Sequence, residues 1–319
     1  MANNTYLKKL MGASPHIEMM VRRVYRSPLL STFFKPSKRI KKEEKVATAN
    51  FKNILKYLNS IGIKKGDIVI VHSAYGSLKS TGLTPRQIID LLLDMVGVEG
   101  TIAMPVIRKY PESPLEKDAL VASIDKILFT YDVQNSKVWT GILPKTLMMR
   151  QDAYTSRFPL NTLTAVGSDA KEMMKNNLEG DLPTPNGVNS SWKYCADRNA
   201  WVISLGVDLT HSLTMIHTVE DVKKFDWPIL DWYRKKKFRI IDNDFVEEKI
   251  VLERHPKWGM LHFAERKLAN DLIMKGIMKT CMIDGVLVES LQSKDLIGFL
   301  DKNNSKGYPY YWVNKFLKK

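Results

Sequence analysis

"GDIVIVHSAYGSLKSTGLTPRQIIDLLLDMVGVEGTIAMPV", residues 66–106, contains a strand, a helix and a second strand. The apolar run at 68–71 is continuous and β-branched, which is typical of a strand buried on both faces of a parallel sheet. The segment 84–97 predicts a helix that begins with a threonine cap followed by proline. A second short strand is expected at 99–106. This order of elements predicts an α/β fold with at least partly parallel strands.

The alternation of helices and strands continues on both sides of this stretch. We expect an amphipathic helix at 47–63, a third strand at 200–208, one or two strands within 280–289 and a closing helix at 293–303. Residues 46–301 therefore read as one mixed α/β domain, in which a partly parallel central sheet is flanked by helices. A chain of 319 residues is long enough to bury a large hydrophobic core.

Positive charge is concentrated at the two ends of the chain, whose net charge is +15. Residues 1–45 carry 11 Lys and Arg against 3 Asp and Glu, a net of +8, and residues 302–319 carry 5 Lys and no acid. The domain at 46–301 is therefore left with only +2. A protein that binds nucleic acid needs a basic face on its folded body. We expect no nucleic-acid partner.

Each basic end has two interpretations. The N-terminal segment HIEMMVRRVYRSPLL predicts an amphipathic helix with basic residues off its apolar face. This helix either lies on an anionic membrane or docks on the body or on a partner subunit. The C-terminal segment YPYYWVNKFLKK is either an interfacial anchor or a packed tail. The apolar positions of the N-terminal helix are Ile17, Met20, Val21, Val24 and Tyr25.

Several classes of protein are disfavoured by what the sequence lacks. Two cysteines, Cys195 and Cys281, argue against a disulfide framework and a Cys-rich metal site, and both fall in elements expected to pack in the core. No apolar run approaches the length of a membrane span, and no secretory signal is evident. We expect a cytoplasmic protein. Zinc is not expected, because His211 and His217 would face different sides of a helix and no HExxH motif is present.

Ligands of open α/β sheets gather on the loops that follow the carboxyl ends of the strands. This rule selects the loop at 71–82, the end of the strand at 99–106 and the segment at 206–220. The first loop is rich in glycine and hydroxyl residues and can offer backbone N–H groups to phosphate oxygens. It matches neither the P-loop nor the GxGxxG pattern, so an ordinary turn stays an alternative.

The segment HSLTMIHTVE at 211–220 contains the strongest candidate for acid–base chemistry. If it is helical, Thr214, His217 and Glu220 lie three residues apart and lean over one another. A carboxylate can orient an imidazole and stabilise its protonated form while the other ring nitrogen accepts a proton. The segment is therefore either a general-base site or a polar helix face.

Five blocks in the same order resemble the aminoglycoside 3-N-acetyltransferase family. The first is the stretch 66–106, with His-Ser at a strand end, a Ser-Leu loop and Gly-x-x-Gly-Thr-x-x-x-Pro. The others are TGILPKTLMMR, TSRFPLNTLTAVG, AWVISLGVDLTHSLTMIHTVE, which contains Thr-x-x-His-x-x-Glu, and a C-terminal block that begins at HFAERK and ends at LIGFL. The resemblance covers about residues 46–300.

This resemblance implies a mixed α/β fold that is distinct from the commoner acetyltransferase fold. It implies transfer of an acyl group from acetyl-coenzyme A, or another acyl-coenzyme A, to an amine without a metal. It assigns the general-base role to His217, with Thr214 and Glu220 beside it. The residues that it assigns to the coenzyme are His72, Ser73, Tyr75, Gly76, Ser77 and Leu78.

The acceptor is expected to be a small-molecule amine, namely an amino sugar. Family members often read Arg-Ser-x-His-Pro-x-x-Ser where this chain reads TSRFPLNT at 155–162, so the Arg and His of that pattern are missing. A neutral body with basic ends favours an anionic, nucleotide-linked amino sugar of polysaccharide biosynthesis. An aminoglycoside antibiotic is the alternative acceptor, and a non-catalytic scaffold that uses its basic ends is the alternative of another class. We expect a homo-oligomer with possible peripheral membrane contact.

Overall fold

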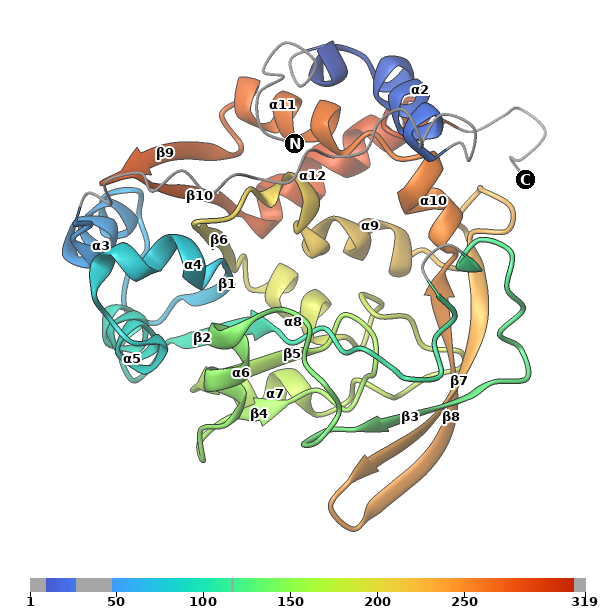
Figure 1. Ribbon diagram of the computed structural model, residues 1–319, viewed down its shortest axis with the longest axis horizontal. Coiled ribbons are helices and arrows are strands. Elements are labelled where there is room, and N and C mark those ends of the chain that lie inside the picture. Colours follow the sequence, from blue (N-terminus) through green and yellow to red (C-terminus); the bar gives the residue numbers. More distant parts are fainter. Residues whose placement is uncertain (1–9, 27–47, 116–117, 313–319) are drawn as a thin grey trace.

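The computed structural model describes residues 10–26, 48–115 and 118–312. A mixed seven-stranded sheet crosses the body (Figure 1), in the order β4-β5-β2-β1-β6-β10-β9. The strands are β1 (Ile68–Ser73), β2 (Thr101–Pro105), β4 (Tyr154–Thr155), β5 (Leu163–Gly167), β6 (Trp201–Leu205), β9 (Lys279–Ile283) and β10 (Val286–Gln292).

The middle of this sheet is parallel and its two margins are antiparallel. Strand β1 pairs in parallel with β2 and with β6, whereas β5, β4, β10 and β9 run antiparallel to their neighbours. Ile68 and Ile70 pack in the core on one face, and Val69 and Val71 pack in the core on the other. This confirms the mixed, partly parallel α/β sheet predicted from the continuous apolar run.

Helices cover both faces of the sheet. One face packs against α3 (Phe51–Ser60), α5 (Pro85–Val96) and α6 (Ile142–Met148), and the other against α7 (Ala170–Met174), α8 (Ser191–Asp197), α11 (Glu265–Met274) and α12 (Ser293–Asn304). Helix α5 begins as predicted, with a capping box in which Thr84 and Gln87 satisfy each other's backbone N–H groups. Cys195 is buried in α8, whereas Cys281 on the edge strand β9 is only partly buried, so the expectation that both are core residues was half right.

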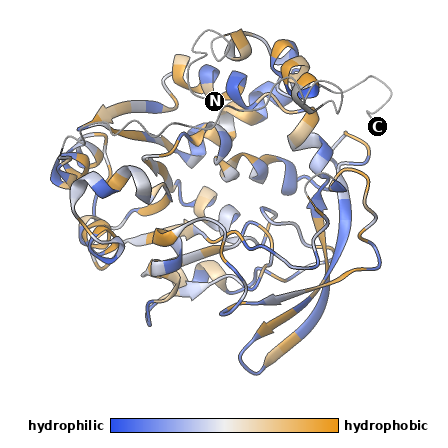
Figure 2. Cartoon of the chain, in the orientation of Figure 1, coloured by the Kyte–Doolittle hydropathy of each residue, from blue (hydrophilic) through white to orange (hydrophobic). Residues whose placement is uncertain are grey.

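A second sheet has three strands, β3 (Leu128–Asp132), β7 (Tyr233–Asp242) and β8 (Phe245–Arg254), with β7 in the middle. The β7–β8 hairpin is long, and many of its residues are hydrophilic (Figure 2). The buried side of this sheet carries an aromatic cluster that includes Phe129 of β3 and Phe238 of β7. The Lys236 ammonium lies 4.3 Å from the centre of the Phe129 ring. None of the elements predicted above falls on this sheet.

The N-terminal segment forms the predicted helix, α2 (Pro15–Arg26), which packs on α10 (Pro256–Leu261) and α11. Glu18 and Met19 face the body, whereas Met20 and Val24 are 59% and 39% exposed. The apolar stripe predicted for this helix is therefore not its most buried face: Ile17 and Val21 are only half-buried. The preceding residues 1–9 and the charged segment at 27–47 lie outside the described part of the chain.

Part of the C-terminal tail also packs on the body. The backbone of Phe263 and Tyr311 forms an antiparallel bridge just before α11. Residues 313–319 lie outside the described residues. None of the helices in the described part of the chain combines the length and the apolar character that a bilayer crossing needs.

Candidate functional site

A pocket of about 470 Å³ opens where the parallel strands end. His72 and Ser73 at the end of β1, Pro105 at the end of β2 and Val207 just after β6 contribute to its wall. The three places selected from the sequence therefore meet at one edge of the sheet, as the rule for open α/β sheets requires. The remaining lining residues are Val71, Ile107, Trp139, Thr140, Gly141, Pro144, His211, Ser212 and Thr214.

The expected loop after β1 is a pair of short helical turns, α4 (Tyr75–Leu78) and a 3-10 turn at Lys79–Thr81. The hydroxyls of Ser77, Ser80 and Thr81 donate to carbonyls, as in the contact of 3.1 Å from Ser77 Oγ to the Gly206 carbonyl. Gly206 has a φ of +73°, and a Cβ there would lie 2.5 Å from Ser77 Cβ. Only glycine allows β6 to end so close to α4.

His72 and Ser73 present polar atoms without protein partners. His72 Nε2 and Ser73 Oγ are buried and lack a hydrogen-bond partner among the described residues. Buried polar atoms of this kind are rare in native proteins, and a pocket is one place where a ligand can satisfy them. The imidazole of His72 stacks on Trp192 of α8, with 6.5 Å between the ring centres. Burial lowers its pKa to about 4, so it is neutral at pH 7.

The low pKa of His72 predicts acid sensitivity. In the unfolded chain the imidazole titrates near its ordinary 6.5, so between 6.5 and about 4 the unfolded state binds the extra proton. Stability is therefore lost as pH falls through that window, by roughly 2–3 kcal/mol from this group. Urea unfolding at pH 7.5 and 4.5 measures the loss, and His72→Gln should reduce it. His16→Gln, which changes an exposed histidine, should not. Equal losses in all three proteins would contradict this account.

His217 and Glu220 form a hydrogen-bonded pair in the turns that follow Thr214, a residue of the pocket lining. The segment 211–220 is not one helix: a 3-10 turn at Thr214–His217 leads into α9 (Thr218–Asp221), and His211 ends a separate 3-10 turn. His217 Nδ1 lies 3.2 Å from Glu220 Oε2. The His217 side chain is 17% exposed and that of Glu220 only 3%. The predicted spacing of three residues is thus realised for this pair, and Thr214 precedes it on the pocket wall.

The electrostatics of the pair favour an ionised Glu220 and a neutral His217. Burial, and next the charge of Arg254, lower the pKa of His217, although Glu220 opposes both. Burial alone would raise the pKa of Glu220, but His217, Arg254 and the Tyr311 hydroxyl together lower it. An ionised Glu220 accepts from Nδ1–H, which leaves Nε2 as the ring nitrogen able to take a proton. This arrangement suits a general base near neutral pH.

A second buried carboxylate adjoins the pair. Asp221 accepts from the Tyr233 hydroxyl at 2.8 Å and from the Asn186 backbone N–H at 2.8 Å. Burial, and then the charge of Glu220, raise the pKa of Asp221 to about 7. The Asn186 amide donates to the Thr214 carbonyl at 3.1 Å and accepts from Asn161 at 2.8 Å. This network ties α9 to the loop before β5.

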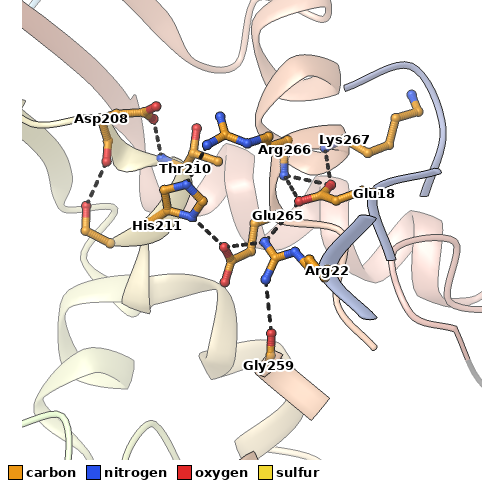
Figure 3. A network of polar contacts seen from close by, with 10 residues as sticks. Glu18, Arg22, Asp208, Thr210, His211, Gly259, Glu265, Arg266 and Lys267 are labelled. Carbon is orange, nitrogen blue, oxygen red and sulfur yellow. Dashed lines mark hydrogen bonds and ion pairs between the residues drawn. The ribbon is translucent and has the colours of Figure 1, made fainter. Parts of the chain in front are cut away.

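His211 on the pocket wall is held from the other side by charged residues of α11. Its Nδ1 lies 2.6 Å from Glu265 Oε2, and its Nε2 lies 2.9 Å from Arg266 Nη2. Arg22 of α2 pairs with the same Glu265 at 2.7 Å, and Glu18 of α2 accepts from the α11 backbone (Figure 3). Glu265 thereby links Arg22 of the N-terminal helix to His211 on the pocket wall.

The structure brings together only some of the residues selected from the sequence. His72, Ser73 and Thr214 line the pocket, and His217 and Glu220 lie one turn beyond Thr214. Tyr75, Gly76 and Ser77 lie on the adjoining turn outside the pocket lining. Leu78 is fully buried in the core, so the structure does not place it where a ligand could contact it. Among the described residues, no group of His, Cys, Asp or Glu is arranged to hold a metal ion.

Sequence reasoning missed several residues of this region. Trp139 to Gly141 enter the pocket from the segment before α6, and the signal that could have found them is the family block TGILPKTLMMR, which begins at Thr140. Arg254 and Tyr311 approach Glu220 from distant parts of the chain. Their sequence positions carry no local pattern that could have linked them to the site.

The comparisons with known proteins agree with this architecture. Aminoglycoside N(3)-acetyltransferase VIII of Streptomyces fradiae is 25% identical in an alignment of 268 residues that covers 77% of this chain and 88% of that protein. Aminoglycoside N(3)-acetyltransferase IX of Micromonospora chalcea is 28% identical in an alignment of 204 residues that covers 59% of this chain and 70% of that protein. The solved structure of AAC-IIIb with CoASH has a TM-score of 0.66 at 18% identity, covering 81% of this chain and 97% of that one. AAC(3)-Xa has a TM-score of 0.64 at 19% identity, covering 78% and 90%.

The fold is thus the mixed α/β architecture of these solved structures. The family model described as aminoglycoside 3-N-acetyltransferase matches residues 70–302. The chain belongs to the aminoglycoside 3-N-acetyltransferase family. The family resemblance and the enzyme class predicted from the sequence are confirmed.

Proposed function

We propose that this enzyme transfers an acetyl group from acetyl-coenzyme A to a primary amine of an amino sugar, with His217 as general base. One observation carries the proposal: a neutral, Glu220-paired His217 lies one turn from a pocket at the carboxyl ends of the parallel strands. The coenzyme is supported by the AAC-IIIb structure, which contains CoASH.

The pocket residues fit a thioester cosubstrate. Acetyl-coenzyme A supplies an electrophilic carbonyl carbon. His72 Nε2 and Ser73 Oγ, both buried without protein partners among the described residues, are available to its polar atoms. We assign the pantetheine and the pyrophosphate to the segment at 72–82, through Ser73 and the backbone of the α4 turn.

Transfer needs an uncharged amine, a proton acceptor and a donor to the carbonyl oxygen. The amine nitrogen bonds to the carbonyl carbon, its proton passes to His217 Nε2, and the carbon–sulfur bond breaks to release the thiolate. Glu220 stabilises the resulting imidazolium. Thr214, or a backbone N–H near Ser73, is placed to stabilise the oxyanion. No covalent enzyme intermediate is required.

The named relatives support an aminoglycoside as acceptor. Both curated proteins are named as aminoglycoside N(3)-acetyltransferases, and homologous structures carry sisomicin or apramycin. This favours the antibiotic acceptor, which was the alternative in the sequence analysis, over the nucleotide-linked amino sugar. An aminoglycoside is therefore the first acceptor that we propose.

One observation keeps a nucleotide-linked amino sugar as the second candidate. The domain at 46–301 carries a net charge of +2 rather than the negative charge that would attract a polycationic drug. Release of coenzyme A thiol should be measured with sisomicin, apramycin and a nucleoside-diphosphate-linked amino sugar. Efficient turnover of sisomicin and apramycin alone supports an antibiotic acceptor. Turnover of the nucleotide-linked amino sugar alone would show that the acceptor is of that class instead.

We expect acetyl-coenzyme A to stabilise the protein against heat. At a hundred times Kd, binding adds about 2.7 kcal/mol, which corresponds to a shift of a few degrees in Tm. Ser73→Leu should abolish the shift because the added side chain enters the pocket, whereas Ser60→Leu, the same change at the exposed end of α3, should keep it. If the unmodified protein gains no stability at millimolar coenzyme, the non-catalytic scaffold becomes the better explanation.

A further inference from the structure

Glu220 has a second hydrogen-bond partner besides His217, and it comes from the C-terminal tail. The Tyr311 hydroxyl donates to Glu220 Oε1, while His217 Nδ1 lies 3.2 Å from Oε2. Each of the two carboxylate oxygens of Glu220, which is almost fully buried, therefore has a hydrogen-bond partner. Tyr311 lies beyond residues 70–302, the part matched by the family model. The contact therefore comes from the tail, outside the matched part of the chain.

The segment that carries Tyr311 is fixed independently of this hydrogen bond. Ala264 N–H donates to the Tyr310 carbonyl at 2.9 Å, and Trp312 N–H donates to the His262 carbonyl at 2.9 Å. The ring of Tyr311 stacks on Phe263, with 4.8 Å between the ring centres, and meets Trp232 edge-on at 5.2 Å. The body therefore holds the ring in place, and the ring holds its hydroxyl against Glu220.

Charged groups from several elements face the same pair. Arg254 at the end of β8 lowers the pKa of both His217 and Glu220, and Glu265 of α11 raises that of His217. Burial raises the pKa of Glu220, so the donors around it are what keep it ionised. Tyr311 is the neutral donor of that set.

Asp221 is the remaining ionisable neighbour on α9. Its own partners are the Tyr233 hydroxyl and the Asn186 backbone, and its pKa of about 7 leaves it partly protonated at neutral pH. It therefore competes little with Glu220 for the role of a fixed negative charge. Glu220, not Asp221, is the carboxylate through which Tyr311 can act on His217.

We propose that Tyr311 is a positioning residue for the acetyl transfer: its hydroxyl holds Glu220 in the orientation that fixes the Nδ1–H tautomer of His217 and draws part of the carboxylate charge away from the imidazole. The proposal rests on the role proposed above for His217. Without the hydroxyl, more negative charge faces the ring, and the imidazolium is stabilised.

The test compares Tyr311→Phe with Tyr310→Phe. Tyr310 is the matched control because its hydroxyl also donates to a carboxylate, Asp271 on α11, at 2.9 Å. Phenylalanine at 311 keeps the ring contacts, so folding should be preserved, and thermal unfolding checks this. The pKa of His217 is read by NMR from the Cε1 signals of the six histidines, with His217→Gln for assignment.

We expect the pKa of His217 to rise by about half a unit or more in Tyr311→Phe and to stay unchanged in Tyr310→Phe. An unchanged or lower value in Tyr311→Phe, or an equal rise in both variants, overturns the proposal. This readout needs no acceptor, so it stands even if the proposed amines are not substrates. With an active amine, the acid limb of kcat/KM should move upward by the same amount, and kcat should fall while KM for acetyl-coenzyme A stays constant.

Discussion

His217→Ala is expected to lower kcat about a hundredfold to ten-thousandfold while the affinity for acetyl-coenzyme A changes little. The reason is that His217 is the neutral imidazole paired with Glu220, and it does not line the pocket assigned to the coenzyme. Single-turnover kinetics measure the chemical step, and calorimetry measures coenzyme binding. Because the pKa of His217 lies below its ordinary value, the unmodified enzyme should keep its rate into mildly acidic solution.

His16→Ala is the control for this change. His16 lies exposed on α2, so its removal should leave kcat unaltered. Glu220→Gln should give an intermediate loss, because the amide keeps a hydrogen-bond partner for the imidazole but cannot stabilise its charge. A rate near that of the unmodified enzyme in His217→Ala would remove His217 from the mechanism and would leave the two histidines of the pocket lining, His72 and His211, to test.

Glu18→Ala is expected to lower the free energy of unfolding by about 3–5 kcal/mol. Glu18 is completely buried and accepts from the backbone N–H groups of Arg266 and Lys267 at 3.0 and 3.1 Å. It also pairs with Arg22 at 3.0 Å. Alanine would leave these donors without an acceptor at the start of α11. Urea unfolding measures the loss.

Two variants separate the contributions of Glu18. Glu18→Gln keeps an acceptor oxygen and should lose less than Glu18→Ala. Glu172→Ala removes an exposed first-turn carboxylate of α7, whose ion pair with Lys175 is 3.6 Å long, and should change stability by less than 1 kcal/mol. Equal stability of Glu18→Ala and the unmodified protein would mean that α2 does not dock on the body in solution and would favour the membrane interpretation of this helix.

The central sheet could be predicted because its signals are local. The apolar run of β1, the capped helix α5 and the strand β2 that follows Gly100 each satisfy a rule that involves only neighbouring residues. In β7, by contrast, the buried positions are Lys236, Phe238 and Ile240. The alternation therefore begins with a lysine, and its ammonium is compensated by Glu253 and by aromatic rings from elsewhere in the chain. Sequence patterns cannot reveal compensation of this kind.

The candidate site divides in the same way. The pairing of His217 with Glu220 follows from a spacing of three residues, and the position of His72 follows from a strand that ends there. The local break at Leu213, with φ of −73° and ψ of 71°, separates His211 from this turn and was not signalled by residue types. The partners Arg254 and Tyr311 depend on how β8 and the tail fold back over α9, which no local rule encodes.

Both chain ends converge on the start of α11: α2 caps it with Glu18, and the tail pairs with the residues just before it. A fragment trimmed to the family-matched region would therefore lose more than two peripheral extensions. Removal of both ends would expose the first turn of α11. Glu265, which contacts His211, would lose its ion pair with Arg22, and Glu220 would lose its hydrogen bond from Tyr311. We expect the protein with both terminal segments removed to be less stable and less active than the full chain.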